Sequence, residues 1–317
     1  MSSVLGLRQG ACFTLASVAL VLLSASPAQS AETLRWKFQP GKSIAYEMQQ
    51  NMEMHTTIRG QKIKTATSQT MDLTWHVDSV SRDGSCRMTQ TIDRIRLSLE
   101  GPTGTVEYDS SAEEQPNDAL LNTLRPVFES MVGAQFSLKM DALGHVSDVR
   151  IPEQFRKSLK DQPAGQMGAF SEESMKQMVE QASLILPQPA VSTNQKWNSQ
   201  SEFDMPFGVL KTNNQMTYVG PARTGNVPLE NIRMTSSVRV ETAPDSPLGI
   251  ELKEQATSGT IQFDNAAGHV HGSTVTQKMV MTVKADGQSM QQNVTQTRRL
   301  QIKQPQTAGT NRSVQKR

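Results

Sequence analysis

The sequence predicts an α+β fold that is mainly β, with a long curved antiparallel sheet or half-barrel and two to three helices packed on its concave face. Long segments in two blocks, residues 33–110 and 195–303, alternate between apolar and polar residues with the period of a strand. Between them, residues 116–187 have helical periodicity. Strand blocks on either side of helices indicate antiparallel pairing, because a parallel sheet would alternate strand and helix.

The two ends of the chain are predicted to lie outside this fold. Residues 1–30 combine a basic start, an apolar run and small residues, the pattern of a secretory signal peptide cleaved near Ser30. Residues 305–317 are basic and have no apolar pattern, so we expect a disordered tail. The prediction is therefore a single β-rich domain at 31–304, periplasmic or secreted, with no transmembrane segment in the mature chain.

The first strand block contains the clearest alternation. Leu34, Trp36 and Phe38 share one face of a first predicted strand. From residue 44 to residue 58 the even positions are mostly apolar and the odd ones polar, and a tight turn at residues 59–60 leads into a second strand as long. In the next strand the alternation changes phase near Asp93, which predicts a β-bulge and a bend.

The helical middle begins at Pro116 to Asp118, after which a stripe of apolar residues runs to Met131. Pro126 lies within this stripe and favours two helical pieces over one. A second short helix is predicted at 152–160 and a third from Ser171.

The last stretch, Gly259 to Ile302, predicts a strand, a tight turn and two long strands that form the closing edge of the curved sheet. Its first six residues match Gly104 to Asp109 in the pattern Gly-Thr-hydrophobic-x-aromatic-Asp. This echo suggests two related halves.

Composition excludes several classes of protein. The 32 basic and 30 acidic side chains give a net charge of +2, so there is no general attraction to nucleic acid. Once residues 1–30 are removed, Cys86 is the only cysteine, so no internal disulfide is possible, and we interpret it as a small buried residue rather than a reactive thiol. No cofactor is expected, and the oligomeric state is not predicted.

Motifs for catalysis are scarce. The chain has no nucleophile elbow, no zinc-protease motif and no glycine-rich phosphate loop. His269 and His271 lie two residues apart on a strand and are weak candidates for a metal site with Asp264 or His145. The alternative is a polar outer face after a turn, so we predict no metal and no catalytic residue.

Methionine is the unusual residue, with 17 copies against 5% aromatic residues. Methionine is flexible and suits surfaces that adapt to varied apolar ligands, although it also fills ordinary cores. The candidate ligand-binding residues on the apolar faces of the long strands are Met48, Met52, Met54, Met71, Trp75, Met88, Met279 and Met281.

With its signal-like start, long hairpins, helical middle and the Gly104 and Gly259 strands, the chain resembles an uncharacterised family of secreted bacterial proteins, a domain of unknown function. It is more distantly similar to the lipoprotein-carrier superfamily of the bacterial envelope (LolA and LppX types). That similarity implies a curved half-barrel closed by helices over a hydrophobic cavity, but no residue motif can be transferred.

Three functions follow as hypotheses. The first is an exported, noncatalytic envelope protein that binds a lipid or a lipidated partner in a methionine-lined concavity. The second is a structural or protein-interaction module with a filled core, and the third is a metal-dependent hydrolase at His269 and His271. The state of the space between sheet and helices, empty or filled, discriminates between the first two.

Overall fold

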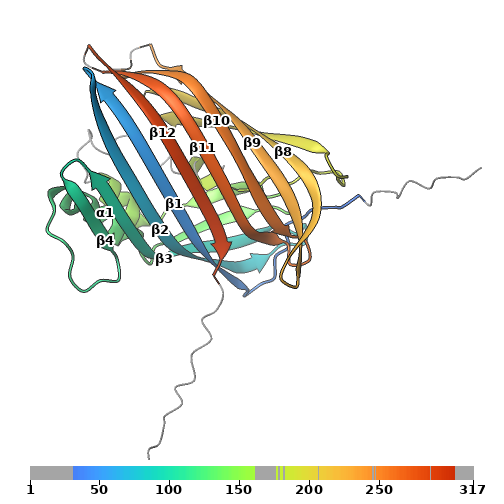
Figure 1. The fold of residues 1–317 in the computed structure, drawn as a ribbon. Coiled ribbons are helices and arrows are strands. Elements are labelled where there is room, and N and C mark those ends of the chain that lie inside the picture. The colour runs from blue at the N-terminus through green and yellow to red at the C-terminus, as the bar shows by residue number, and fades with distance from the viewer. Residues whose placement is uncertain are drawn as a thin grey trace, which may run out of the picture. The chain divides into compact units, whose positions relative to one another are not determined.

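The computed structural model describes residues 31–160, 176–177, 179–180, 183–205, 207–244, 246, 248–285 and 287–303. The predicted signal peptide, the basic tail and most of the predicted third helix therefore lie outside the described residues. In the described part, twelve antiparallel strands form one open, curved sheet (Figure 1), which confirms the predicted fold class.

Along the sheet the strand order is β6-β5-β3-β2-β1-β12-β11-β10-β9-β8-β7, and β4 pairs with β3 beside this path. The strands are β1 (Ser43–Ile58), β2 (Gln61–Val80), β3 (Cys86–Gly101), β4 (Gly104–Asp109), β5 (Gln135–Met140), β6 (Val146–Arg150), β7 (Lys196–Met205), β8 (Gly208–Thr224), β9 (Val227–Thr242), β10 (Leu248–Asp264), β11 (His269–Ala285) and β12 (Gln288–Ile302).

The first hairpin forms as predicted. Arg59 and Gly60 both have positive φ, 49° and 84°, and these dihedrals suit a two-residue hairpin turn whose twist matches the strands. The register of β2 against β3 shifts between Asp72 and Leu73, which confirms the bulge predicted at Asp93. Bulges of this kind bend long strands and so help the sheet to curve.

The prediction that Gly259 to Ile302 forms the closing edge is wrong. β12 pairs with β1 over almost its whole length, so the end of the second strand block joins the start of the first in the middle of the sheet. β6 and β7 end the sheet instead. Alternation shows which face of a strand is buried, but it does not show whether the strand has one neighbour or two.

The two matching segments, Gly104–Asp109 and Gly259–Asp264, also occupy different positions. The first is the whole of β4, a short strand paired only with β3, whereas the second ends the central strand β10. Their aromatic residues, Tyr108 and Phe263, are both buried. The shared pattern therefore reflects a common local need for a buried aromatic residue before a turn.

Two helices lie on the concave face beside β3 to β5. α1 (Ala119–Met131) begins at Asp118, whose carboxylate accepts hydrogen bonds from the backbone N–H groups of Leu120 and Leu121. α1 continues through Pro126, so the prediction of two pieces is wrong; one lost backbone hydrogen bond is offset by packing of its apolar stripe against β3 and β4. α2 (Glu153–Lys160) forms where predicted.

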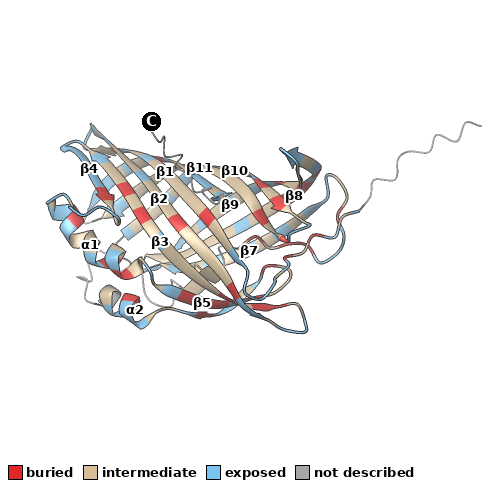
Figure 2. Cartoon of the chain, turned by 90° about the horizontal axis from the view of Figure 1, so that it is seen from below, coloured by how far each residue is buried: buried red, intermediate tan, exposed pale blue. Residues whose placement is uncertain are grey.

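One end of the concave face is filled by two segments that are distant in sequence. Leu34, Trp36, Leu184, Leu186 and Val191 are buried there, in one cluster with side chains from β2, β3, β5 and β8–β11. We call these two segments, residues 32–38 and 184–191, the plug. Figure 2 shows buried positions at this end and mainly intermediate ones along the long strands.

The predicted first strand is wrong in one respect. Residues 34–38 alternate as expected, but they join no strand ladder; a single bridge links Glu32 to Val191. Trp36 instead donates its backbone N–H to Ala142 and its indole N–H to the carbonyl of Leu184. An extended segment buried on alternate residues therefore has the same sequence pattern as a strand. No described helix is long and apolar enough to cross a membrane.

Candidate functional site

The inner face of the five central strands, β10, β11, β12, β1 and β2, is the candidate site. Strand pairing fixes which side chains share it: Met54 pairs with Val294, and Val294 pairs with Met279 on the other side. Because side chains alternate along a strand, every second residue from these three belongs to the same face. The opposite, outer face carries mainly Thr, Gln, Asn, Lys and Glu.

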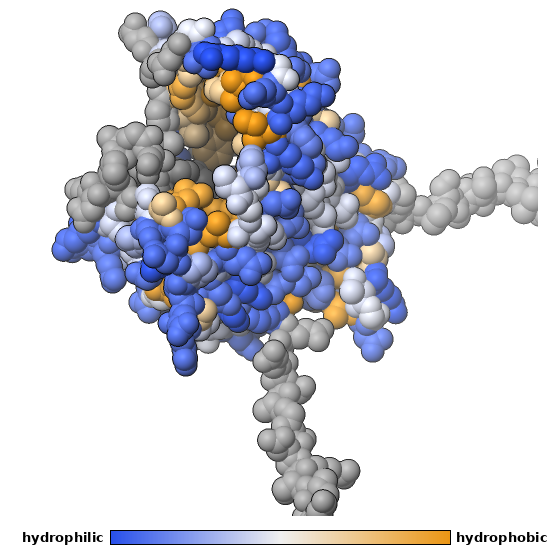
Figure 3. All heavy atoms as spheres, turned by 60° about the vertical axis from the view of Figure 1, so that its left-hand side comes forward, coloured by the Kyte–Doolittle hydropathy of each residue, from blue (hydrophilic) through white to orange (hydrophobic). Residues whose placement is uncertain are grey.

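Five of the eight candidate residues are half-buried on this inner face. Their side chains belong to no buried cluster, although each lies on a central strand with paired neighbours on both sides. These residues are Met48, Met52, Met54, Met279 and Met281. Figure 3 shows a hollow in the molecule with apolar residues on its wall and hydrophilic residues around its rim.

The other three candidates lie in packed regions. Met88 is 3% exposed in the plug cluster, and Trp75 packs beside it, 6.4 Å from Trp36 between ring centres. Met71 packs against the cluster beneath α1. The structure thus separates the eight into a half-buried group and a group in or beside the cores, and ligand contact by any of them stays a prediction.

Arg298 is a residue of the inner face that sequence reasoning missed. In β12 it pairs with Gln50 of β1 and Val275 of β11, and it lies four residues from the buried, inward-facing Val294. No other lysine or arginine occupies an inner-face position of the five central strands. The sequence suggested only a basic terminus here, although the alternation of β12 already places residue 298 on the apolar face.

The surroundings of Arg298 combine two properties. Solvent reaches the Arg298 side chain, yet nearby protein atoms partly desolvate its guanidinium and lower its pKa. A side chain on the concave side of a curved sheet can combine both properties, because protein lies on several sides of it while solvent still reaches it. The guanidinium has no ion pair and no hydrogen bond to another residue of the described part, and it stays charged because arginine titrates far above neutral pH.

Glutamines surround Arg298 on the inner face. Gln50 is its partner in β1, and Gln69 of β2 pairs with Gln50. In the next row along the strands, Gln277 pairs with Gln296. None of the four side-chain amides hydrogen-bonds to another residue in the part of the chain that the structure describes. We call Arg298 and these four glutamines the polar belt.

The polar belt separates two apolar regions of the inner face. On the plug side, Leu300 packs against the buried cluster. On the other side, from Val294 to Met290 of β12, the inner face is mainly apolar and includes Met54, Met279 and Met281, with Gln292 as a polar residue among them. On β10, the side-chain oxygens of Gln255 and Thr257 are buried without a hydrogen-bond partner, so the inner face also holds unsatisfied polar atoms.

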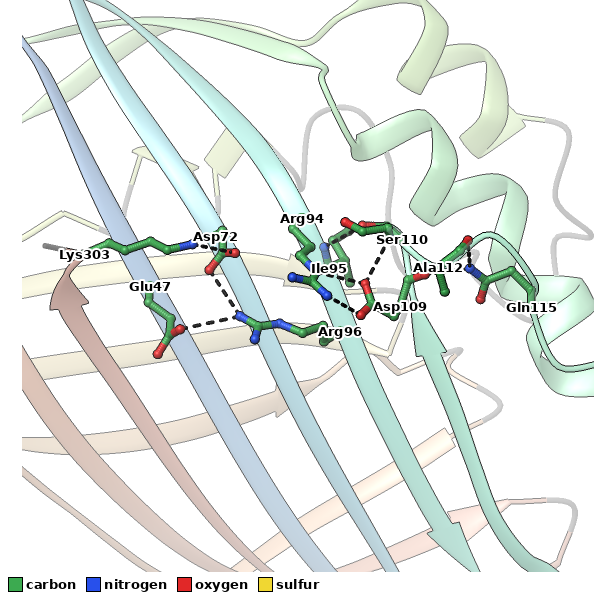
Figure 4. A network of polar contacts seen from close by, with 11 residues as sticks. Glu47, Asp72, Arg94, Ile95, Arg96, Asp109, Ser110, Ala112, Gln115 and Lys303 are labelled. Carbon is green, nitrogen blue, oxygen red and sulfur yellow. Dashed lines mark hydrogen bonds and ion pairs between the residues drawn. The ribbon is translucent and has the colours of Figure 1, made fainter. Parts of the chain in front are cut away.

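The outer face carries a network of ion pairs instead (Figure 4). The Asp72 carboxylate contacts Arg96 at 3.2 Å and Lys303 at 2.9 Å, and Arg94 forms a two-point pair with Asp109. This guanidinium lowers the pKa of Asp109 to about 2. A shallow groove of about 430 Å³ beside it includes Arg96, Asp109 and Glu114 in its lining. Every charge in the network has an opposite partner, which indicates a structural role.

The weak metal candidates do not come together. Asp264 uses a carboxylate oxygen to accept the backbone N–H of Ala267, and His145 contacts Asp141. Among the described residues, no three histidine, cysteine, aspartate or glutamate side chains converge in a way that could hold a metal. Cys86 is fully buried and burial raises the pKa of its thiol to about 11, as expected for a small packing residue.

A family model described as a family of unknown function (DUF6263) matches residues 83–311. No curated protein matches the chain. A lipovitellin structure described for its lipid–protein interactions aligns with a TM-score of 0.44 and 9% identity, over 84% of this chain and 26% of that one. This chain therefore spans about a quarter of the length of the lipovitellin chain.

Two further structures align with TM-scores of 0.22. DynF from the dynemicin biosynthesis pathway of Micromonospora chersina is 9% identical over 87% of each chain. OccK5 (OpdH) of Pseudomonas aeruginosa is 7% identical over 83% of this chain and 99% of that one. At these scores the matches carry no information about function.

Proposed function

The chain belongs to a family of unknown function (DUF6263), and on the geometry of its inner face we propose that it binds a lipid in the hollow of its curved sheet. The observation that carries the proposal is the set of half-buried methionines on the central strands. At their other end, the inner face of the sheet is covered by a packed cluster of buried side chains. Binding requires no chemistry at the ligand, so we propose a noncatalytic protein.

Energetics favour a ligand over an empty hollow. Full burial of a methionine side chain is worth about 1.5–3 kcal/mol relative to exposure. Met52, Met54 and Met279 are only half-buried, so part of that energy is unused in the free protein. An apolar chain laid along them would recover it. Because methionine adapts its shape, such a wall suits ligands of varied structure.

The compartment is part of the proposal. Residues 1–30, which lie outside the described residues, have the sequence pattern of a signal peptide. A lipid carrier or lipid-binding protein of the bacterial envelope would act after export. The similarity to the lipoprotein-carrier superfamily stays a prediction, and a lipidated protein is the alternative source of the same acyl chain.

Two measurements test the proposal. In the first, the protein is purified from a lysate that still contains membranes, extracted with organic solvent, and the extract is analysed for lipid by mass spectrometry. In the second, binding of the apolar dye N-phenyl-1-naphthylamine is followed by fluorescence. We expect co-purified lipid, and dye binding that oleyl alcohol displaces.

Paired variants locate the site. Met54→Gln with Met279→Gln places polar groups in the hollow, and we expect it to weaken dye binding at least tenfold, since two apolar contacts are lost. Thr57→Gln with Thr282→Gln alters the outer face of the same strands and should leave binding unchanged. If the wild-type protein carries no lipid and binds no dye, the hollow is not a lipid site and the interaction-module hypothesis becomes the better one.

A further inference from the structure

The polar belt has a composition that an apolar ligand alone does not explain. A charged side chain that a bound ligand covers is removed from water, which is costly unless the ligand supplies an opposite charge. Arg298 lies on the inner face of β12, where it pairs with Val275 of β11 and is followed on the same face by Leu300. A core built only for packing would place an apolar side chain there. Because solvent reaches Arg298 in the free protein, its charge needs no protein partner and is available to pair with an anionic group of a ligand.

The described residues supply no opposite charge at this position. The inner faces of β10, β11, β12, β1 and β2 hold no aspartate or glutamate. Glu230 faces inward on β9, but its carboxylate accepts a hydrogen bond from the Tyr218 hydroxyl at 2.6 Å, at the plug end. The outer-face acids, such as Asp72 and Glu47, already contact Arg96 on the opposite side of the sheet.

We propose that the hollow takes an anionic amphiphile, whose head group binds Arg298 within the polar belt and whose acyl chain lies along the methionines. This inference rests on the proposed lipid-binding function and names the class of lipid. A guanidinium binds a carboxylate or a phosphate through two parallel hydrogen bonds. The amides of Gln50 and Gln296 lie on the neighbouring inner-face positions and can donate to the remaining oxygens.

The geometry also sets the direction of the acyl chain. The plug blocks the inner face beyond Leu300, so a chain that starts at Arg298 must extend toward Met290. Eight residues of strand separate these positions, about 26 Å at 3.3 Å per residue. That distance accommodates a long single acyl chain. The inner-face residues along it include Val294, Met54 and Met281.

The test compares head groups on one tail in the complete protein. Displacement of N-phenyl-1-naphthylamine is titrated with oleate, oleoyl lysophosphatidate and oleyl alcohol, and with sodium acetate and inorganic phosphate as tail-free anions. We expect the two anionic lipids to bind about 10- to 100-fold tighter than the alcohol, as for a charge-assisted contact. Comparison of the two anionic lipids distinguishes a carboxylate from a phosphate source.

Arg298→Met removes the charge while keeping an apolar side chain of similar length, and should reduce affinity for the anionic lipids to that for the alcohol. Arg299→Met is the matched control, since Arg299 is the next residue of β12 and points to the outer face. Circular dichroism checks that both variants fold. If Arg298→Met does not fold, Arg298→Gln serves as an uncharged, polar replacement.

Each outcome decides a separate point. If oleyl alcohol and oleate bind equally to the wild type, or if Arg298→Met weakens both equally, the hollow binds lipid but the anion inference is wrong. Displacement of the dye by acetate or phosphate alone would overturn it in favour of a free-anion site. If none of the lipids binds, the proposed function itself fails.

Discussion

The two ends of the inner face share the same strands but differ in what covers them. At the plug end, Trp36 and Leu186 fill the space over β2 and β10 and leave side chains such as Met88 and Phe263 almost fully buried. On β1, which pairs with β2, Met52 and Met54 are only half-buried. Figure 3 shows a hollow with an apolar wall in the molecule. Apolar alternation therefore specifies a face that avoids water, and the covering segments decide whether it becomes a core or a binding site.

The plug should be the most sensitive part of the molecule. Trp36→Ala removes an indole that is 4% exposed, packs edge-on to Phe263 at 5.6 Å and hydrogen-bonds to Leu184. We expect a loss of about 3–5 kcal/mol in the free energy of unfolding, measured by urea denaturation. Leu120→Ala, at a residue 52% exposed on α1, should cost less than about 0.5 kcal/mol. A small loss at Trp36 would mean that the plug does not pack as described.

Two methionines compare the core and the hollow directly. Met88→Ala opens a cavity in the plug cluster and should cost about 2–4 kcal/mol. Met52→Ala removes a half-buried side chain from the wall of the hollow and should cost less than about 1 kcal/mol in lipid-free protein, because solvent already reaches it. Equal losses in thermal or urea unfolding would show that the hollow is packed solid.

Glycine substitutions test how closely the plug approaches the sheet. Gly144 has φ 96°, and a Cβ atom there would lie 2.2 Å from the Leu184 carbonyl oxygen and 2.7 Å from the Trp36 ring nitrogen. Gly144→Ala should therefore cost about 2–3 kcal/mol, through strain and a disturbed plug. Gly60, at φ 84° with no atom within 4 Å, is the control; alanine there should cost only about 1 kcal/mol of backbone strain.

The outer face should respond to pH rather than to packing. Arg94 lowers the pKa of Asp109 from 3.8 to about 2, so the pair stabilises the fold above the unfolded pKa and loses that contribution as the pH falls from about 4 through 2. Since the pair is partly exposed, we expect Asp109→Asn to cost only about 1 kcal/mol at pH 7 and less at pH 2. Unfolding measured at both pH values checks this, and a loss that does not shrink in acid would exclude the ion pair as its cause.

Much of the fold could be predicted because the signals are local. Alternation marked the long strands, the turn at Arg59 and Gly60 followed from residue type, and the phase change gave the bulge at Asp93. The same alternation made residues 34–38 look like a strand, although they are an extended plug segment. Pairing partners, such as β12 beside β1, depend on residues more than 200 positions apart and leave no local pattern.

The candidate site shows the same division. The sequence by itself determined which residues share the inner face, including Met54, Met279 and, by position, Arg298, because a strand alternates its side chains whatever its neighbours are. Only the tertiary structure decided that the plug buries Met88 and stops short of Met52, and that Arg298 lies on the same face between the packed and the half-buried rows. Burial depends on which distant segments cover a face, and that depends on the packing of the whole chain.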